Sequence, residues 1–288
     1  MEKIKTASTI KHSIKKYNHP SLQTMVAGLI CCLLISCQSS DKSSEEYKED
    51  EMVNSVDFAL NNDVTSESIP PVEIVDTCGL RVYFPNYSKI DLVCGKMPTK
   101  DDTSVIMFAE AAFTGELLEE FNHKNISSNH VSGGEYYPGY LCKRSRGAFT
   151  YYNGKPQFVY QDGFQNVSWP EYLESALRTA AQEGGCGFAQ EIMIHEGKKT
   201  PHTRPDSNAN EFRALCLIDG KVAVADSRGT MKFGDFINNL IKAGATEAIY
   251  LDMGRGWNYS WYRDANGNPI EIHPTPTKYA TNWITFYR

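Results

Sequence analysis

The sequence predicts an α+β fold, in which two main helices cover a mixed, largely antiparallel sheet. Many short segments show the alternation or the apolar runs that are typical of β-strands, whereas two segments repeat apolar residues at helical spacing. Two dipeptides, Asn153-Gly154 and Asp219-Gly220, each separate two strand-like segments and indicate tight hairpins, because both central residues can adopt positive φ. A strand-rich chain with few helices is typical of the α+β class.

The predicted strands are apolar or alternating runs, several of them bounded by turn residues such as those at 266–269. Each run is short enough to be a strand and too short to be a typical helix. In chain order, we expect strands at residues 80–84, 90–94, 104–108, 148–152, 157–160, 191–195, 213–218, 222–225, 248–251, 260–263 and 283–287.

Two amphipathic segments are expected to form the helices. The first follows the capping-box pattern from Ser168 to Glu171 and ends at Gly184. The second follows Thr230, which is its expected cap, and ends at Gly244. Its apolar face consists of Phe233, Phe236, Ile237, Leu240 and Ile241. We interpret both helices as packing elements that cover the sheet.

The N-terminal 36 residues are ordered like a bacterial lipoprotein signal peptide. A lysine-rich start precedes an apolar run at residues 25–35, which is about half as long as a membrane-spanning helix requires. The run ends in Leu34-Ile35-Ser36-Cys37, which resembles a lipobox, so Cys37 is the expected lipidated residue and links the protein to a membrane. The alternative is a buried core strand with an incidental cysteine.

Composition divides the rest of the chain into a linker and a folded domain. Residues 37–70 contain many acidic and few apolar side chains, so we expect a disordered linker. Residues 71–288 suit one domain and hold 22 basic and 25 acidic side chains, a balance that excludes the electrostatic footprint of a nucleic-acid-binding protein. The predicted location is the cell envelope, lipid-anchored, either facing the periplasm or exposed on the surface.

The cysteines and histidines of the folded part show no metal-ligand spacing, so we predict no metal site, and the cofactor stays unknown. Cys78 and Cys94, each beside a glycine in neighbouring strand-like segments, are the preferred disulfide pair, with buried free thiols as the alternative. The five cysteines of this part are an odd number, so at least one is unpaired within the chain: Cys78, Cys94, Cys142, Cys186 and Cys216.

A longer pattern extends from Arg213 to Gly254. Arg213 opens a strand, a second strand follows the Asp219-Gly220 turn, and an amphipathic helix ending at Gly244 precedes the run Ala248-Ile249-Tyr250-Leu251-Asp252-Met253-Gly254. This order resembles the phosphodiester glycosidase family, in which A-L-x-L-D-G-G occupies the last position. Fainter similarity at residues 107–113, 146–149 and 189–194 extends the resemblance over most of residues 104–257.

The resemblance implies a hydrolase of glycosyl phosphodiesters, that is, of sugar 1-phosphate diesters on envelope or host glycans. It makes Arg213 the expected clamp for the phosphate, whose oxygens match a planar guanidinium. It makes Asp252 the carboxylate that activates water or stabilises an oxocarbenium-like transition state. Glu110 and Glu191 are the next candidate catalytic carboxylates. The implied partner is a glycan or glycosyl phosphate.

Four further residues are candidates for substrate binding: Arg146, Arg255, Trp257 and His130. The two arginines would contribute to an anion site if their loops converge. Trp257 shares a strand face with Tyr259 and Trp261, a spacing that suits a sugar platform, although core packing is the alternative. His130 is a candidate general base, with a structural loop histidine as the alternative.

Two other functional hypotheses stay open. Met253 replaces a family glycine and Arg255-Gly256-Trp257 replaces the usual Gly-Ser, which favours a non-catalytic glycan-binding surface lipoprotein with the same fold. The aromatic residues at 257–262 would alternatively form the interface of a surface assembly protein.

Overall fold

The computed structural model describes residues 69–139, 146–160, 171–202, 204–205, 207–254, 258–273, 276, 279 and 281–288. The chain divides into two units, Met1–Asn62 and Asp63–Arg288, and the described residues all belong to the second. The expected signal peptide and the lipidated Cys37 lie outside the described residues, as does nearly all of the acidic linker. Within the described ranges, no helix is long and apolar enough to cross a bilayer.

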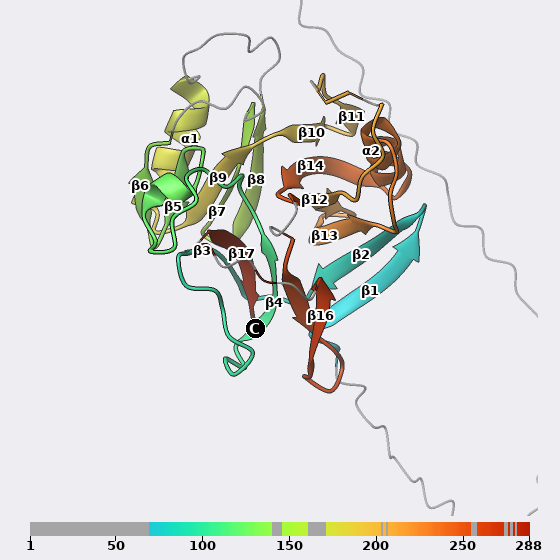
Figure 1. Ribbon diagram of the computed structural model, residues 1–288, viewed down its shortest axis with the longest axis horizontal. Helices are drawn as coiled ribbons and strands as arrows, with labels where there is room; N and C mark the ends of the chain where they lie inside the picture. The colour runs from blue at the N-terminus through green and yellow to red at the C-terminus, as the bar shows by residue number, and fades with distance from the viewer. Residues whose placement is uncertain are drawn as a thin grey trace, which may run out of the picture. The chain divides into compact units, whose positions relative to one another are not determined.

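Three antiparallel sheets make up the folded unit (Figure 1). The strand order of the first sheet is β1 (Val72–Thr77), β2 (Leu80–Pro85), β13 (Lys221–Ser227), β12 (Arg213–Ile218), β14 (Ala245–Leu251), β10 (Ile192–His195) and β11 (Lys198–Lys199). The order of the second sheet is β16 (Pro269–His273), β15 (Ser260–Arg263), β4 (Val105–Glu110), β17 (Asn282–Tyr287) and β3 (Lys89–Cys94). The order of the third sheet is β6 (Glu135–Tyr137), β5 (His130–Ser132), β9 (Cys186–Gln190), β7 (Gly147–Tyr152) and β8 (Lys155–Tyr160).

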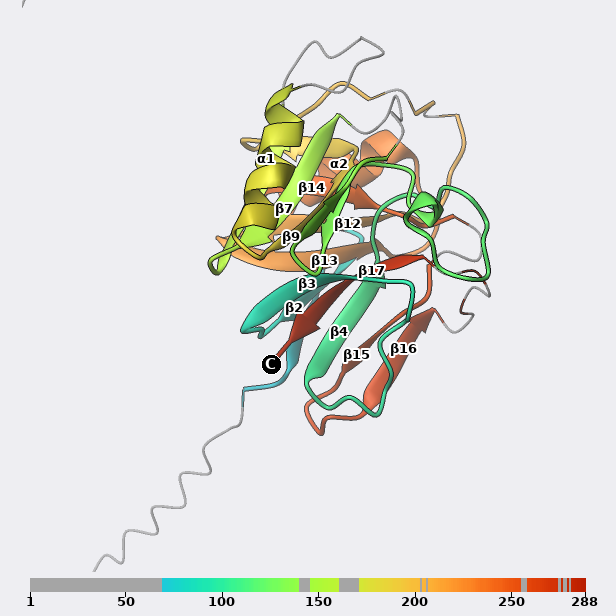
Figure 2. The same cartoon turned by 90° about the vertical axis from the view of Figure 1, so that its left-hand side faces the viewer.

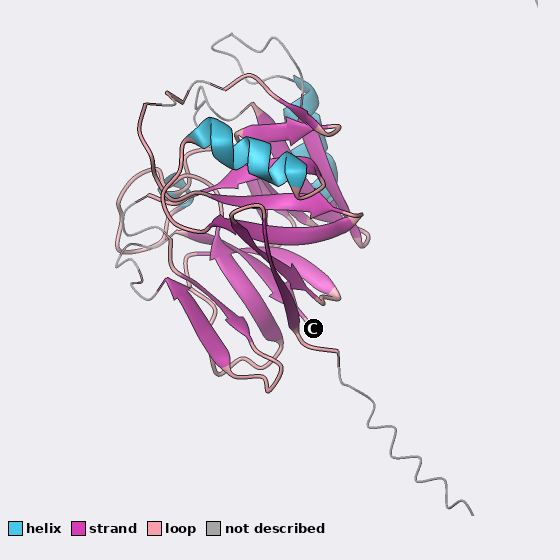
Figure 3. Cartoon of the chain, turned by 90° about the vertical axis from the view of Figure 1, so that its right-hand side faces the viewer, coloured by secondary structure: helices cyan, strands magenta, loops and turns pink. Residues whose placement is uncertain are grey.

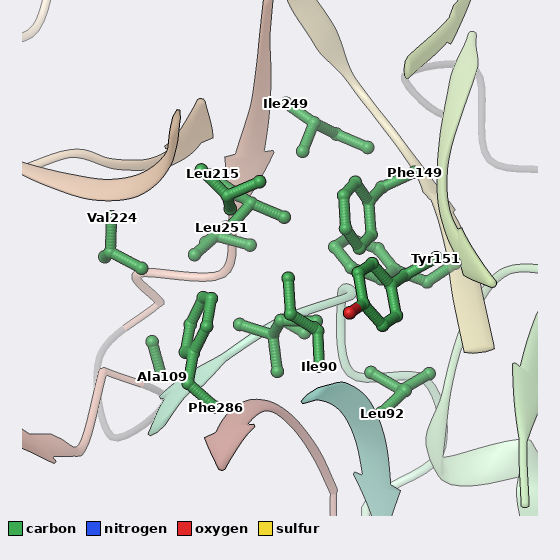
Figure 4. Packing of buried hydrophobic residues seen from close by; sticks show 14 of the residues in the cluster. Ile90, Leu92, Ala109, Phe149, Tyr151, Leu215, Val224, Ile249, Leu251 and Phe286 are labelled. Carbon is green, nitrogen blue, oxygen red and sulfur yellow. The ribbon is translucent and has the colours of Figure 1, made fainter. Parts of the chain in front are cut away.

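The central core lies where the three sheets face one another (Figure 4). Leu215 and Ile249 of the first sheet, Ile90 and Phe286 of the second, and Phe149 of the third all contribute to it. Apolar side chains on one face of each sheet thereby leave water together, which is the main favourable contribution to folding. The sheets consequently hold one another in place without a helix between them.

The two α-helices cover outer faces of the first and third sheets. α1 (Glu171–Gln182) lies along β7 and β9 of the third sheet (Figure 2) and buries Leu173 and Leu177 there. α2 (Phe233–Lys242) lies across strands of the first sheet (Figure 3) and buries Phe236 and Leu240 against them. A short 3-10 helix, η1 (His123–Asn125), precedes β5. The α+β class, the antiparallel pairing and the two covering helices are thus confirmed.

Both predicted hairpins are present, and their turns have the expected backbone. Asn153 and Gly154 have φ of 51° and 72° between β7 and β8, and Asp219 and Gly220 have φ of 50° and 75° between β12 and β13. Positive φ at both positions matches the right-handed twist of the strands on either side. The dipeptides therefore set the register of these two strand pairs.

The structure corrects two local predictions, one about the cap of α2 and one about the cysteines. The cap of α2 is Lys232 and not Thr230, because a backbone bridge between Asn210 and Met231 holds the chain extended until just before the helix. Cys78 and Cys94 are free thiols, so the expected disulfide is absent; Cys78 is exposed and Cys94 is partly buried, and the alternative of buried free thiols holds for Cys186 and Cys216. Ser168 and Cys142 lie outside the described residues.

Candidate functional site

Asp252 lies directly after β14, where the first sheet meets the segment that follows β4. The carboxylate is buried, with 6% of the residue exposed, and its two oxygens accept backbone N–H groups of Gly254 at 2.9 Å and Thr114 at 3.2 Å. The backbone N–H of Asp252 donates to the carbonyl of Ala111 at 2.9 Å. These bonds fix the orientation of the carboxylate. Burial raises the pKa of Asp252 above its usual value, although the accepted hydrogen bonds and the charge of Arg204 oppose the shift.

A pocket of about 590 Å³ lies beside Asp252. More than half of the described side chains in its wall are polar or charged, and three others are aromatic, so the pocket suits a polar ligand. The described residues that line it are Phe113, Arg204, Asn210, Glu211, Phe212, Thr230, Tyr250, Asp252, Met253, Gly254 and Asn258. They come from distant parts of the sequence, so the pocket is assembled only by the tertiary fold.

Arg204 lines this pocket, although no sequence pattern indicates it. The guanidinium lies over the ring of Tyr250 at 4.0 Å from the centroid, and Phe233 and Phe113 lie at 5.1 and 5.5 Å. Nε of Arg204 donates to Oε2 of Glu191 at 2.8 Å. Arg204 stands in a loop before Pro205, without periodicity or motif, so only its tertiary neighbours reveal it.

Glu191 lies behind Arg204, between β9 and β10. Its side chain is 1% exposed, and its backbone carbonyl accepts the N–H of Tyr250 at 2.8 Å. Oε2 pairs with Arg204, whereas Oε1 is buried without a hydrogen-bond partner among the described residues. The structure thus brings both expected carboxylates close to one arginine: Glu191 pairs with Arg204, and Asp252 lines the same pocket as Arg204.

Glu110 is the last residue of β4 and is also buried. Burial raises the pKa of Glu110 well above its usual value, and the negative charge of Asp252 adds to the shift, whereas the charge of Arg213 opposes it. Its Oε1 has no hydrogen-bond partner among the described residues. Glu110 is therefore electrostatically coupled to the candidate site, and its neutral form is favoured.

Arg213 is placed differently from the phosphate clamp that the sequence led us to expect. It is fully buried, and its Nε and Nη2 donate to the two carboxylate oxygens of Asp226 at 2.6 and 2.8 Å. Its Nη1 donates to the carbonyl of Asn258 at 3.2 Å. Because this guanidinium is fully buried and does not line the pocket, Arg213 supports the rim of the pocket through Asn258 and is not available to a ligand in this arrangement.

His130 lies in β5 of the third sheet and is buried. Nδ1 pairs with the carbonyl of Ser128 at 2.9 Å and must donate to it, so Nε2 accepts from Nδ1 of His123 at 2.9 Å. Burial lowers the pKa of His130 to about 4. Both ring nitrogens are engaged within the fold, which supports the structural alternative over a general base in the pocket.

The remaining expected binding residues are not part of the pocket lining that is described. Arg146 is half-buried just before β7 in the third sheet. Arg255 and Trp257 lie outside the described residues. Tyr259 and Trp261 are buried against Phe108, with ring centroids 5.8 and 5.2 Å away, so core packing accounts for this part of the expected sugar platform.

In the part of the chain that the structure describes, no group of three or more histidine, cysteine, aspartate or glutamate side chains is arranged to hold a metal ion.

Comparisons with known proteins give structural similarity without sequence similarity. No family model matches the chain, and no curated protein matches it. A hypothetical protein from Synechocystis has a similar structure, with a TM-score of 0.50 and 11% identity, over 75% of this chain and 61% of that one. The catalytic domain of zebrafish N-acetylglucosamine-1-phosphodiester alpha-N-acetylglucosaminidase, auto-inhibited by its pro-peptide, gives a TM-score of 0.47 and 10% identity over 76% of this chain and 83% of that one. The chain thus spans less than two thirds of the Synechocystis protein, and that likeness concerns the fold alone.

Proposed function

We propose that the protein hydrolyses glycosyl phosphodiesters, that is, sugar 1-phosphate diesters of envelope or host glycans, in the pocket beside Asp252. The observation that carries the proposal is that a buried, oriented carboxylate and an arginine line the same pocket, which is large enough for a sugar. The run of residues from Ala248 to Gly254, which resembles the phosphodiester glycosidase family, adds the choice of reaction.

Hydrolysis of a glycosyl phosphodiester requires few protein groups. The phosphodiester is a good leaving group and barely needs a proton, so a cation near it matters more than an acid. Asp252 would activate the attacking water or stabilise the positive charge that develops on the sugar ring. Its two backbone hydrogen bonds hold the carboxylate in one orientation, which preorganises it for either role.

The location is part of the proposal. Cys37 would carry the lipid, and the acidic residues that follow it would let the folded unit reach glycans at the envelope surface or in the periplasm. The near balance of charge in residues 71–288 suits a single small charged substrate better than a polyanion.

The test is release of the sugar from an N-acetylglucosamine 1-phosphate diester by the full-length protein in detergent. Asp252→Asn should lower kcat/KM by about 100-fold or more, the scale of one acid-base or charge-stabilising group. Asp235→Asn, which changes an exposed aspartate on α2, is the matched control and should leave the rate unchanged. Absence of product with the unaltered protein, or equal rates for Asp252→Asn and the control, would remove the assignment.

A non-catalytic glycan-binding protein is the second candidate. Both oxygens of Asp252 already accept backbone hydrogen bonds, and Met253 lines the pocket where the family pattern has glycine. This candidate predicts saturable binding of the same diester without product. The assay that measures sugar release therefore separates the two.

A further inference from the structure

We infer that Arg204 recognises the phosphate of the substrate, that Glu191 positions Arg204, and that the pocket selects phosphodiester monoanions over phosphomonoester dianions. The inference rests on the proposed function and adds to it the residue that binds the charge. Three observations carry it: the aromatic cage around Arg204, its pairing through Nε with Glu191, the one acceptor among the described residues, and the charges of the pocket wall.

The cage consists of Tyr250 from β14, Phe233 from α2 and Phe113 from the segment after β4. The electron-rich faces of aromatic rings attract a guanidinium, and three rings from three parts of the fold restrict its rotation. Arg204 thus enters the pocket with its planar fork already oriented. A guanidinium that is already held in one orientation loses little conformational entropy when it donates to an oxyanion.

Glu191 uses only one of the guanidinium nitrogens. Oε2 accepts from Nε at 2.8 Å, and Nη2 is buried without an acceptor among the described residues. With 15% of its side chain exposed, Arg204 still reaches the pocket, whereas Glu191 is 1% exposed and does not line it. A charged donor group that lines a pocket with unused N–H groups favours an anionic oxygen as its ligand. Arg213 is fully buried and does not line the pocket, so it offers no donor to a ligand there.

The charge of the wall limits what the pocket can accept. Asp252 and Glu211 line it together with Arg204, which is the one cationic side chain among the described lining residues. A phosphodiester brings one negative charge to a guanidinium that already pairs with Glu191 and to these two carboxylates. A phosphomonoester carries a charge between about −1.5 and −2 at pH 7, so it would bring an unbalanced charge close to two carboxylates. The wall therefore favours the diester.

The experiment measures binding separately from turnover. The probes are diethyl phosphate, which is a monoanion, and inorganic phosphate, which is mostly a dianion at pH 8; each is titrated into the full-length protein in detergent and followed by ligand-observed NMR. We expect diethyl phosphate to bind more tightly than inorganic phosphate. Arg204→Gln should weaken diethyl phosphate binding by roughly 10- to 100-fold, the range for a lost hydrogen bond to a charged group. Arg204→Lys, which keeps the charge and loses the fork, should give an intermediate loss.

Arg178→Gln is the matched control. Arg178 also pairs with a glutamate, Glu174, and lies 4.1 Å from the centroid of the Tyr136 ring, but it is on the surface of α1 and does not line the pocket. Its replacement should leave phosphate binding unchanged. Equal affinity of the unaltered protein and Arg204→Gln for diethyl phosphate, or tighter binding of inorganic phosphate than of the diester at pH 8, would overturn the inference.

Glu191→Gln tests the positioning role. With the glycosyl phosphodiester as substrate, KM should rise several-fold while kcat changes little, because the variant lets Arg204 rotate without removing it. A purely structural role would instead lower the folded fraction and with it kcat, with KM unchanged. Far-UV circular dichroism and urea unfolding of Arg204→Gln, Arg204→Lys and Glu191→Gln show which variants are folded, and the folded ones decide the result.

The two proposals fail in different ways. Arg204-dependent binding of diethyl phosphate without hydrolysis would remove the proposed reaction and keep the phosphate site. Hydrolysis that Arg204→Gln leaves intact would keep the reaction and remove this inference.

Discussion

Arg213 and Asp226 lie opposite each other on β12 and β13 and form a two-pronged ion pair at 2.6 and 2.8 Å. Both side chains are buried. The third guanidinium nitrogen reaches the carbonyl of Asn258, so the pair joins the first sheet to the segment that leads into β15. The arginine that the sequence marked for catalysis is therefore engaged in holding two parts of the fold together.

Breaking this pair should be costly. Arg213→Met leaves the carboxylate of Asp226 buried and unpaired, and we expect the free energy of unfolding to fall by about 3 to 5 kcal/mol. The double variant with Asp226→Leu removes the unpaired charge and should recover much of the loss. Urea unfolding of the single and double variants measures both values. A single variant as stable as the unaltered protein would contradict the burial of the pair.

Glu110 should make the protein less stable as the pH rises. Because its pKa is raised, the folded state keeps a proton that the unfolded chain has lost. The free energy of unfolding therefore falls as the pH rises from the ordinary pKa of a glutamate toward the raised pKa. Glu110→Gln removes this titration. The difference in unfolding free energy between Glu110→Gln and the unaltered protein should therefore shift in favour of the variant from pH 4 to pH 8. A difference that is constant across that range would show that Glu110 ionises normally.

His130 acts in the opposite direction. Its pKa is about 4 in the folded state and ordinarily 6.5, so the unfolded chain binds the proton first and stability is lost as the pH falls from 6.5 to about 4. The loss should amount to about 3 kcal/mol, which is the free energy that corresponds to such a pKa difference. His130→Gln should show a flatter dependence, measured by urea unfolding at pH 7 and pH 4.5.

The thiols should differ sharply in reactivity. Cys78 is exposed, whereas Cys186 and Cys216 are fully buried and burial raises the pKa of Cys216 to about 12. Iodoacetamide at pH 8 should modify Cys78 in the native protein and should reach Cys186 and Cys216 only after denaturation, as read by peptide mass mapping. Without reducing agent, no peptide should join Cys78 to Cys94. Such a linked peptide would restore the disulfide that the sequence favoured.

The sequence was informative where local chemistry decides structure. All the expected strands are present within a few residues of their predicted bounds, because alternation and turn residues act within one segment. Asp252 was also located correctly at the end of a strand, beside glycine. Six strands were missed: β1, β5, β6, β9, β11 and β16. β5, β6 and β11 are too short to carry a pattern, β1 and β16 are edge strands that bury few side chains, and β9 is buried along its whole length and so does not alternate.

Sequence reasoning located only part of the candidate site. The role of Arg204 depends on three rings that are far apart in the sequence, and the burial of Arg213 depends on a partner across a hairpin. Neither arrangement can be recognised from the residues that adjoin the arginine in the sequence. The type of side chain was predictable, an arginine beside a carboxylate, but its position was decided by tertiary contacts.

The strand order of the second sheet affects how the protein folds during synthesis. β17 lies between β3 and β4. The side-chain amide of Asn282, the first residue of β17, accepts from the backbone N–H of Ala112 and donates to the carbonyl of Ala112, although the two residues are 170 positions apart in the sequence. During synthesis, β3 and β4 therefore emerge from the ribosome long before the strand that pairs with both of them. Until then each presents an unpaired edge, which is a hazard for association with other chains. A chain with such a topology is exposed to association with other chains until residues 282–287 have been synthesised.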